Sequence, residues 1–112
     1  MKGGIQMIKI LKKTVEIESN DTKNFKEKHL VLEYYLTENE LDKESFAREN
    51  VYGVEIIKKI KNGDGYIPEA ESEYVVNISN NKNNVEDVLN KLINNTVTPV
   101  ELLYVLDNIV GV

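Results

Sequence analysis

The sequence predicts an α+β domain in which a four-stranded antiparallel β-meander is followed by a C-terminal two-helix hairpin packed on one face of the sheet. Three observations predict this fold. Apolar and polar residues alternate in the first two thirds of the 112-residue chain, the apolar spacing changes to three and four residues in the last third, and short or moderate connections join the predicted strands. Such connections favour antiparallel pairing, because parallel strands need helical crossovers.

The first predicted strand spans residues 7–18. Its apolar residues are β-branched: Ile8, Ile10, Val15 and Ile17. Their alternation slips around residues 11–13, which predicts a strand with a bulge or bend at that point. The polar residues 19–28 then predict a turn.

The second predicted strand, residues 29–36, has the clearest alternation in the chain. Leu30, Leu32, Tyr34 and Leu36 share one face, and Val31, Glu33 and Tyr35 share the other. This period of two is typical of a half-buried strand. Residues 37–50 follow with five acids against Lys43 and Arg48, and they predict a solvated connection with room for one helical turn.

The third and fourth predicted strands are residues 51–60 and 72–79. Between them, residues 62–65 read Asn-Gly-Asp-Gly, whose members tolerate the positive φ angles that a tight hairpin turn requires. In the fourth strand, which follows Pro68, alternation predicts that one face carries three apolar residues: Tyr74, Val76 and Ile78.

The first predicted helix follows from apolar residues at helical spacing. These are Val85, Val88, Leu89, Leu92 and Ile93. The pattern is that of an amphipathic helix, with Asn83 or Asn84 as its N-cap and its end at Asn94-Asn95.

The second predicted helix begins at a capping box. Thr98 is the expected N-cap, Pro99 occupies the position where a missing N–H is harmless, and Glu101 is expected to reach back to the Thr98 amide. Gly111 provides a stop. About four residues separate the two helices, so we expect them to form an antiparallel hairpin.

Length and composition indicate one domain. The chain is long enough for one modest core, and 41% hydrophobic with 29% charged residues is ordinary globular usage. We assign the domain to residues 7–112. The codons for Lys2-Gly3-Gly4 can spell a purine-rich ribosome-binding site ahead of Met7. Our hypothesis is therefore that translation starts naturally at Met7 and that residues 1–6 are a non-native N-terminal extension.

Charge and residue usage exclude several classes of protein. Fourteen basic and nineteen acidic residues give a net charge of −5, and Arg48 is the sole arginine, which argues against nucleic-acid binding. Without cysteine the chain has no disulfide, thiolate metal site or cysteine nucleophile. No apolar run approaches the length of a membrane span and the N-terminus lacks a signal peptide's apolar core, so we predict a cytoplasmic protein.

Residues with potential for chemistry form no recognisable catalytic or metal-binding set. His29 is the only histidine, and at the start of a predicted strand we interpret it as an ordinary surface or edge residue. The acids of residues 38–44 lack the glycine and ligand spacing of a calcium loop. In the Asn-Gly-Asp-Gly segment, Pro68 replaces the third glycine of a dinucleotide-binding motif, so the hairpin turn is the preferred interpretation. We expect no catalytic residue, metal or cofactor.

Two other clusters favour structure over function. Lys58, Lys59 and Lys61 lie close together, and Lys12 and Lys13 join them if their strands are adjacent. Acidic neighbours make a polar sheet face the preferred interpretation over an anion site. The tyrosines Tyr34, Tyr52 and Tyr74 share the phase of their strands' apolar residues, which predicts core or cross-strand packing, although tyrosines also suit interfaces.

The second helix has more apolar surface than one sheet needs. Its main apolar arc covers roughly 160°, whereas an amphipathic stripe needs about 100°. Val100 and Tyr104 form a second flank beyond Asp107, and Leu103 borders the main arc. The first helix, the chain's own loops or another molecule must bury the excess. Val100, Leu103, Tyr104 and Asp107 are therefore the candidate interaction surface.

Several motifs together resemble an uncharacterised family of small clostridial proteins. These motifs are the run Tyr52-Gly53-Val54-Glu55-Ile56, the junction Asn77-Ile78-Ser79 and the segment Thr96-Val97-Thr98-Pro99 with the helix after it. The resemblance covers the chain from about residue 29 onward. It implies one compact cytoplasmic domain from a Firmicute, and it supplies no active site.

The leading functional hypothesis is a non-enzymatic binding or regulatory module that contacts a protein, either a partner or a second copy of itself. One alternative is a small enzyme that uses carboxylates and tyrosines such as Glu33, Glu55 or Tyr35, although no convergent acid, base and nucleophile is visible. The other alternative is a small-molecule sensor domain.

Overall fold

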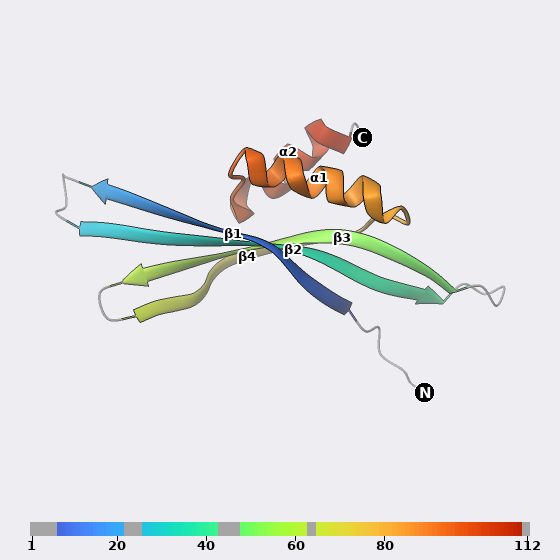
Figure 1. The fold of residues 1–112 in the computed structure, drawn as a ribbon, viewed down its shortest axis with the longest axis horizontal. Helices are drawn as coiled ribbons and strands as arrows, with labels where there is room; N and C mark the ends of the chain where they lie inside the picture. The colour runs from blue at the N-terminus through green and yellow to red at the C-terminus, as the bar shows by residue number, and fades with distance from the viewer. Residues whose placement is uncertain (1–6, 22–25, 43–47, 63–64, 111–112) are drawn as a thin grey trace.

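The computed structural model describes the backbone of residues 7–21, 26–42, 48–62 and 65–110. It confirms the α+β fold: an antiparallel sheet of order β1-β2-β3-β4 followed by two C-terminal helices that pack on it (Figure 1). The strands are β1 (Met7–Asp21), β2 (Lys26–Asp42), β3 (Arg48–Asn62) and β4 (Gly65–Ser79). The helices are α1 (Lys82–Asn94), the 3-10 turn η1 (Pro99–Glu101) and α2 (Leu102–Val110).

The helices lie on one face of the sheet, over its middle (Figure 1). The 13 residues of α1 span about 20 Å at the rise of an α-helix. The 15 to 17 residues of each strand span about 50 Å. The hairpins formed by the strands therefore extend well beyond the helices.

The core lies between the helices and the central strands. Antiparallel pairing places Tyr34 opposite Ile56 and Leu36 opposite Val54, so that the alternate residues predicted to share a face do share it. The buried core combines residues from β2, β3, both helices and the segment between them: Leu32, Tyr34, Leu36, Val54, Ile56, Val85, Leu89, Leu92, Val97, Leu102 and Leu106.

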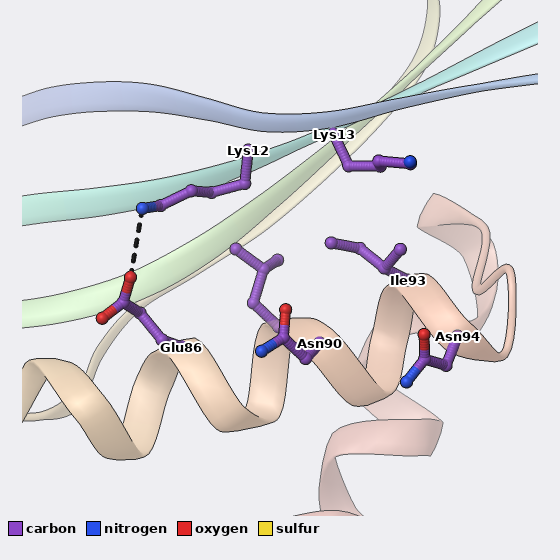
Figure 2. A pocket seen from close by; sticks show the side chains of 7 residues that line it. Lys12, Lys13, Glu86, Asn90, Ile93 and Asn94 are labelled. Atoms are coloured by element: carbon purple, nitrogen blue, oxygen red, sulfur yellow. Dashed lines mark hydrogen bonds and ion pairs between the residues drawn. The ribbon is translucent and has the colours of Figure 1, made fainter.

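The bulge predicted in the first strand is confirmed. Leu11 pairs with Tyr35 and Lys13 with Tyr34, so Lys12 is an extra residue in β1. Such an insertion interrupts strict alternation. Both lysines consequently lie on the side of the sheet that faces α1 (Figure 2).

The predicted solvated connection at residues 37–50 is wrong for most of its length. β2 continues to Asp42 and β3 begins at Arg48, and Thr37 and Asn39 are buried. In this stretch buried and more exposed polar residues alternate: Thr37 and Asn39 are buried, whereas Glu38 and Glu40 are not. Alternation among polar residues leaves no apolar pattern in the sequence. The predicted helical turn falls on residues 43–47, which lie outside the described residues. The predicted turn at residues 19–28 is likewise shorter, because β1 reaches Asp21 and β2 starts at Lys26.

The hairpin predicted at residues 62–65 agrees with the pairing of Asn62 with Gly65, although its two central residues lie outside the described ones. The prediction for the fourth strand is partly wrong. β4 starts at Gly65 and includes Pro68, which an edge strand tolerates. Two register irregularities interrupt its pairing with β3. They shift the phase, so that Tyr74 is 54% exposed while Val75 and Ile78 pack on the core.

Gly53 lies where strand β4 leaves no room for a side chain. One of the two irregularities lies between Tyr52 and Val54, and there β4 passes over Gly53. A Cβ built on Gly53 would lie 2.1 Å from the Val75 carbonyl oxygen and 2.9 Å from Thr37 Oγ1. No side chain fits there. The same close approach explains why Thr37, on the face without helices, has no exposed surface.

α1 starts earlier than predicted. Its N-cap is Asn81, whose side chain accepts a hydrogen bond from the Asn84 amide, so the assignment to Asn83 or Asn84 is wrong. The predicted end at Asn94-Asn95 is confirmed. The Thr96 amide donates to Ile93 and the Val97 amide to Leu92, the Schellman arrangement, which puts Thr96 at a φ of 51°. Glycine usually occupies this position, because β-branched residues fit it poorly.

The predicted start at Thr98 is confirmed, with the first turn wound as 3-10 helix. The Glu101 carboxylate accepts from the Thr98 amide at 3.1 Å and from the Thr98 hydroxyl at 2.9 Å. These hydrogen bonds favour the ionised carboxylate and lower the pKa of Glu101. They fix the direction in which α2 leaves the loop.

A buried tyrosine ties this loop to the sheet. The Tyr34 hydroxyl, on β2, donates to the Val97 carbonyl oxygen at 2.9 Å. Burial, with a smaller contribution from the charge of Glu101, raises the pKa of Tyr34 to about 12. The side chain therefore stays neutral and donating throughout the physiological range.

Candidate functional site

α2 presents the surface that its sequence singles out. The helix buries Leu102 and Leu106 against the core. Val100 is 75% exposed, Tyr104 74% and Leu103 55%, and Asp107 is exposed beside them. These four residues, called the α2 surface below, recur at spacings of three and four and so lie side by side. No described residue of the chain covers them, and their role as an interaction surface stays a prediction.

The α2 surface has an acidic border. Glu101 is exposed and lies one residue after Val100, and Asp107 lies within the surface itself. No lysine or arginine is present in residues 92–112. Within residues 92–112, the charged side chains near the apolar residues of the α2 surface are therefore all acidic.

The face of the sheet without helices carries a network of paired charges. Lys59 Nζ lies 3.1 Å from Glu33 Oε2, and the Tyr35 hydroxyl donates to Glu33 Oε1 at 2.9 Å. On the other side of Tyr35, Lys9 Nζ lies 3.0 Å from Glu55 Oε1 and 5.1 Å from the centre of the Tyr35 ring. Each carboxylate thus has a lysine, and the cation–π contact joins the two pairs.

This network brings together the three residues of the enzyme hypothesis, Glu33, Tyr35 and Glu55. Tyr35 donates to Glu33, Glu33 pairs with Lys59, and Glu55 pairs with Lys9, an arrangement that stabilises the sheet. None of the three lines the cavity described below, which lies on the opposite face. Among the described residues, no group of three or more acids and histidines is arranged to hold a metal ion.

Exposed apolar residues flank the network. Pairing aligns Leu11, Tyr35, Glu55 and Tyr74 in one row across the four strands. Leu11 is 50% exposed and Tyr74 54%. The sequence misses this row because it assigns Tyr74 to the core, and only the irregular pairing of β4 turns that side chain outward.

The predicted lysine cluster is dispersed. β2 separates β1 from β3, so Lys12 and Lys13 do not join Lys58 and Lys59. Lys58 pairs with Glu71 at 2.8 Å on the helix side, whereas Lys59 pairs with Glu33 on the other side. The interpretation as a polar, charge-paired strand is the one that the contacts favour.

His29, interpreted as a surface or edge residue, lies on the inner strand β2, which rules out the edge. Its side chain is partly buried, and Nε2 lies 3.7 Å from Glu16 Oε2 on the neighbouring strand.

A cavity of about 370 Å³ lies between β1 and α1 (Figure 2). Its walls are the two lysines of the β1 bulge and one side of the helix: Lys12, Lys13, Glu86, Leu89, Asn90, Ile93 and Asn94. Lys12 Nζ bonds Glu86 Oε2 at 3.1 Å across its mouth. Sequence reasoning missed this site. The slip in alternation at residues 11–13 marks its strand side, but nothing local indicates which helix lies opposite.

A family of unknown function, DUF6514, matches residues 13–112. The chain belongs to this family. The match starts at Lys13, directly after the extra residue of the β1 bulge, and includes the other strands and both helices. The α2 surface and every cavity residue except Lys12 therefore lie within the DUF6514 region. No curated protein and no solved structure matches the chain. In the described part of this DUF6514 protein, no helix is long and apolar enough to cross a membrane.

Proposed function

We propose that this protein is a small non-enzymatic binding or regulatory module that acts through protein–protein contact, with the α2 surface as its contact site. One observation carries the proposal: a helix anchored by Leu102 and Leu106 exposes Val100, Leu103 and Tyr104 on its other side. Contiguous exposed apolar side chains of this kind are typical of interaction sites. Tyrosine in particular is enriched at the centres of protein interfaces.

The α2 surface is held rigidly, which favours binding. The Glu101–Thr98 hydrogen bonds fix the start of the helix, and the Tyr34–Val97 hydrogen bond ties the preceding loop to β2. A surface that is already ordered loses little conformational entropy when it binds.

Association through the sheet edges is less favourable. β1 is interrupted by the bulge at Lys12, and β4 is interrupted twice and contains Pro68. Bulges, lysines and proline are the usual features that prevent an edge strand from pairing with another chain. A contact between faces is therefore the expected mode.

The partner that we propose is a second copy of the chain, joined α2 to α2 in a weak dimer. Three apolar side chains per copy make a smaller surface than the roughly 800 Å² that each partner of a stable complex buries. Antiparallel contact of two copies also brings acidic residues of the two α2 surfaces near one another. Salt screens such repulsion, so the dimer should strengthen as salt rises.

Sedimentation velocity or light scattering on the wild type and Tyr104→Glu, at low and high salt, tests this proposal. We expect concentration-dependent association of the wild type that increases with salt, and a monomer for Tyr104→Glu. The control is Tyr74→Glu, which places the same charge at an exposed tyrosine on the opposite face and should associate as the wild type does. A wild-type monomer unaffected by Tyr104→Glu would remove the α2 interface.

A small-molecule sensor is the second candidate, and the cavity between β1 and α1 favours it. The small carboxylate-dependent enzyme has less support, because Glu33 and Glu55 are each paired with a lysine. For the setting of the protein we propose the cytoplasm of a clostridium-like Firmicute. The lack of cysteine and the motif resemblance support this setting.

A further inference from the structure

The β1 bulge places two consecutive lysines against a helix. Alternation in a regular strand would put only one of two neighbours on that side. Here Lys12 and Lys13 both line the cavity whose other wall is α1 (Figure 2). Lys12 is neutralised by Glu86, at 3.1 Å. Lys13 has no ion pair or hydrogen bond with any described residue, and it leaves the cavity with one net positive charge in a chain of net charge −5.

The wall provided by α1 adds two amides. Glu86, Asn90 and Asn94 are four residues apart and form a stripe along the side of the helix that borders β1. The side chains of Asn90 and Asn94 make no hydrogen bond with the described residues, so their NH₂ groups are available as donors. Leu89, which is buried, and Ile93, which is half-buried, supply an apolar floor beside this stripe.

A simpler explanation for Lys13 is attraction to the carboxyl end of α1, whose last carbonyl groups carry partial negative charge. Those groups already have partners. The Lys91 carbonyl accepts from Asn95, that of Leu92 from Val97, and that of Ile93 from Thr96. The end of the helix is thus capped by its own backbone, and Lys13 remains available to a ligand.

We propose that this cavity binds a small organic monocarboxylate, with Lys13 as the counter-charge and Asn90 and Asn94 as hydrogen-bond donors. One unpaired cation matches a single negative charge, and the apolar floor of Leu89 and Ile93 suits a carbon body. A phosphate dianion fits poorly, because its second charge would lie near the Glu86 carboxylate. The volume of about 370 Å³ is at the lower end of the range for ligand pockets, about 300–1,000 Å³.

The charges at the cavity predict opposite effects for two substitutions. Lys13→Gln removes the counter-charge and should weaken binding about tenfold, which corresponds to about 1.4 kcal/mol. Glu86→Gln removes a repelling carboxylate and releases Lys12, so it should strengthen binding by a few-fold. The matched control is Lys91→Gln, which removes the same charge from an exposed position on α1 that does not line the cavity.

Titration of the full ¹⁵N-labelled chain with sodium benzoate, followed by amide chemical shifts, tests the proposal. We expect saturable shifts at Lys13, Asn90 and Ile93, weakened in Lys13→Gln, strengthened in Glu86→Gln and unchanged in Lys91→Gln. The same spectra report whether each variant is folded. Benzamide at equal concentration should not bind, because it lacks the charge. The proposal is overturned if benzoate produces no saturable shift, if Lys13→Gln and Lys91→Gln weaken binding equally, or if only inorganic phosphate binds.

Discussion

Replacing Gly53 with alanine gives the sharpest test of the packing between β3 and β4. The added Cβ would lie 2.1 Å from the Val75 carbonyl oxygen, whereas ordinary contact begins at 3.4 Å, so the shortfall is 1.3 Å. It would also lie 2.7 Å from the Val76 Cα. Both are backbone atoms of the paired strand, and neither can move aside as the end of a flexible side chain would.

The expected loss of stability follows from two opposing effects. Overpacking costs about 1–3 kcal/mol, and displaced backbone places this site at the upper end. Replacing glycine where its backbone conformation suits alanine stabilises by about 0.4–1 kcal/mol, through the unfolded state. The φ of Gly53 is an ordinary one, so this gain applies. We expect a net loss of about 2 kcal/mol or more. The free energy of unfolding typical of a chain of 112 residues is about 6–17 kcal/mol, so this loss is a large part of it.

Urea denaturation followed by circular dichroism measures this loss. The midpoint should fall while the slope m stays constant, because the surface exposed on unfolding does not change. Ser72→Ala is the matched control, since Ser72 is exposed on the neighbouring strand and the change should stay within about 0.5 kcal/mol. Gly53→Ala as stable as the wild type would refute the close approach of β4.

Two further substitutions test the loop between the helices. Tyr34→Phe leaves the buried Val97 carbonyl without its donor and should cost about 1–2 kcal/mol in urea denaturation. Because the pKa of Tyr34 rises from 10.0 to about 12 on folding, the folded chain keeps a proton that the unfolded chain loses. The stability that this retained proton contributes is complete below pH 10 and disappears toward pH 12. The free energy of unfolding should therefore fall less between pH 10 and pH 12 in Tyr34→Phe than in the wild type. An equal fall in the two proteins would contradict the buried hydrogen bond. Thr96→Gly should raise the free energy of unfolding by about 0.5–1 kcal/mol, because glycine accepts the φ of 51° without strain; a destabilised variant would contradict the cap geometry.

Local patterns in the sequence were sufficient for the elements and for most of the face assignments. Leu32, Tyr34 and Leu36 alternate because one face of β2 packs on helices, and the register confirms that face. The slip near residue 12 is a bulge, and the Thr98–Glu101 spacing is a helix start. Each of these features depends on residues within a few positions of one another, where backbone geometry limits the alternatives.

The extent of the strands and the outward turn of Tyr74 depended on tertiary structure. Thr37 is buried because β4 crosses over Gly53, and Tyr74 is exposed because the pairing of β4 is irregular. Polar residues that pair in a sheet have no apolar alternation to mark them, so strand pairing alone shows where β2 ends.

For the candidate sites the division is the same. Helical spacing in the sequence is enough to predict the excess apolar surface of α2, since it places Val100, Leu103 and Tyr104 together without reference to the sheet. Only the tertiary structure left that surface uncovered, and only it placed Lys13 opposite Asn90 and Asn94. Lys13 lies far from Asn90 and Asn94 along the chain, and their proximity depends on how α1 packs across the sheet beside β1. Periodicity reports which face of an element is buried, but not which distant element buries it.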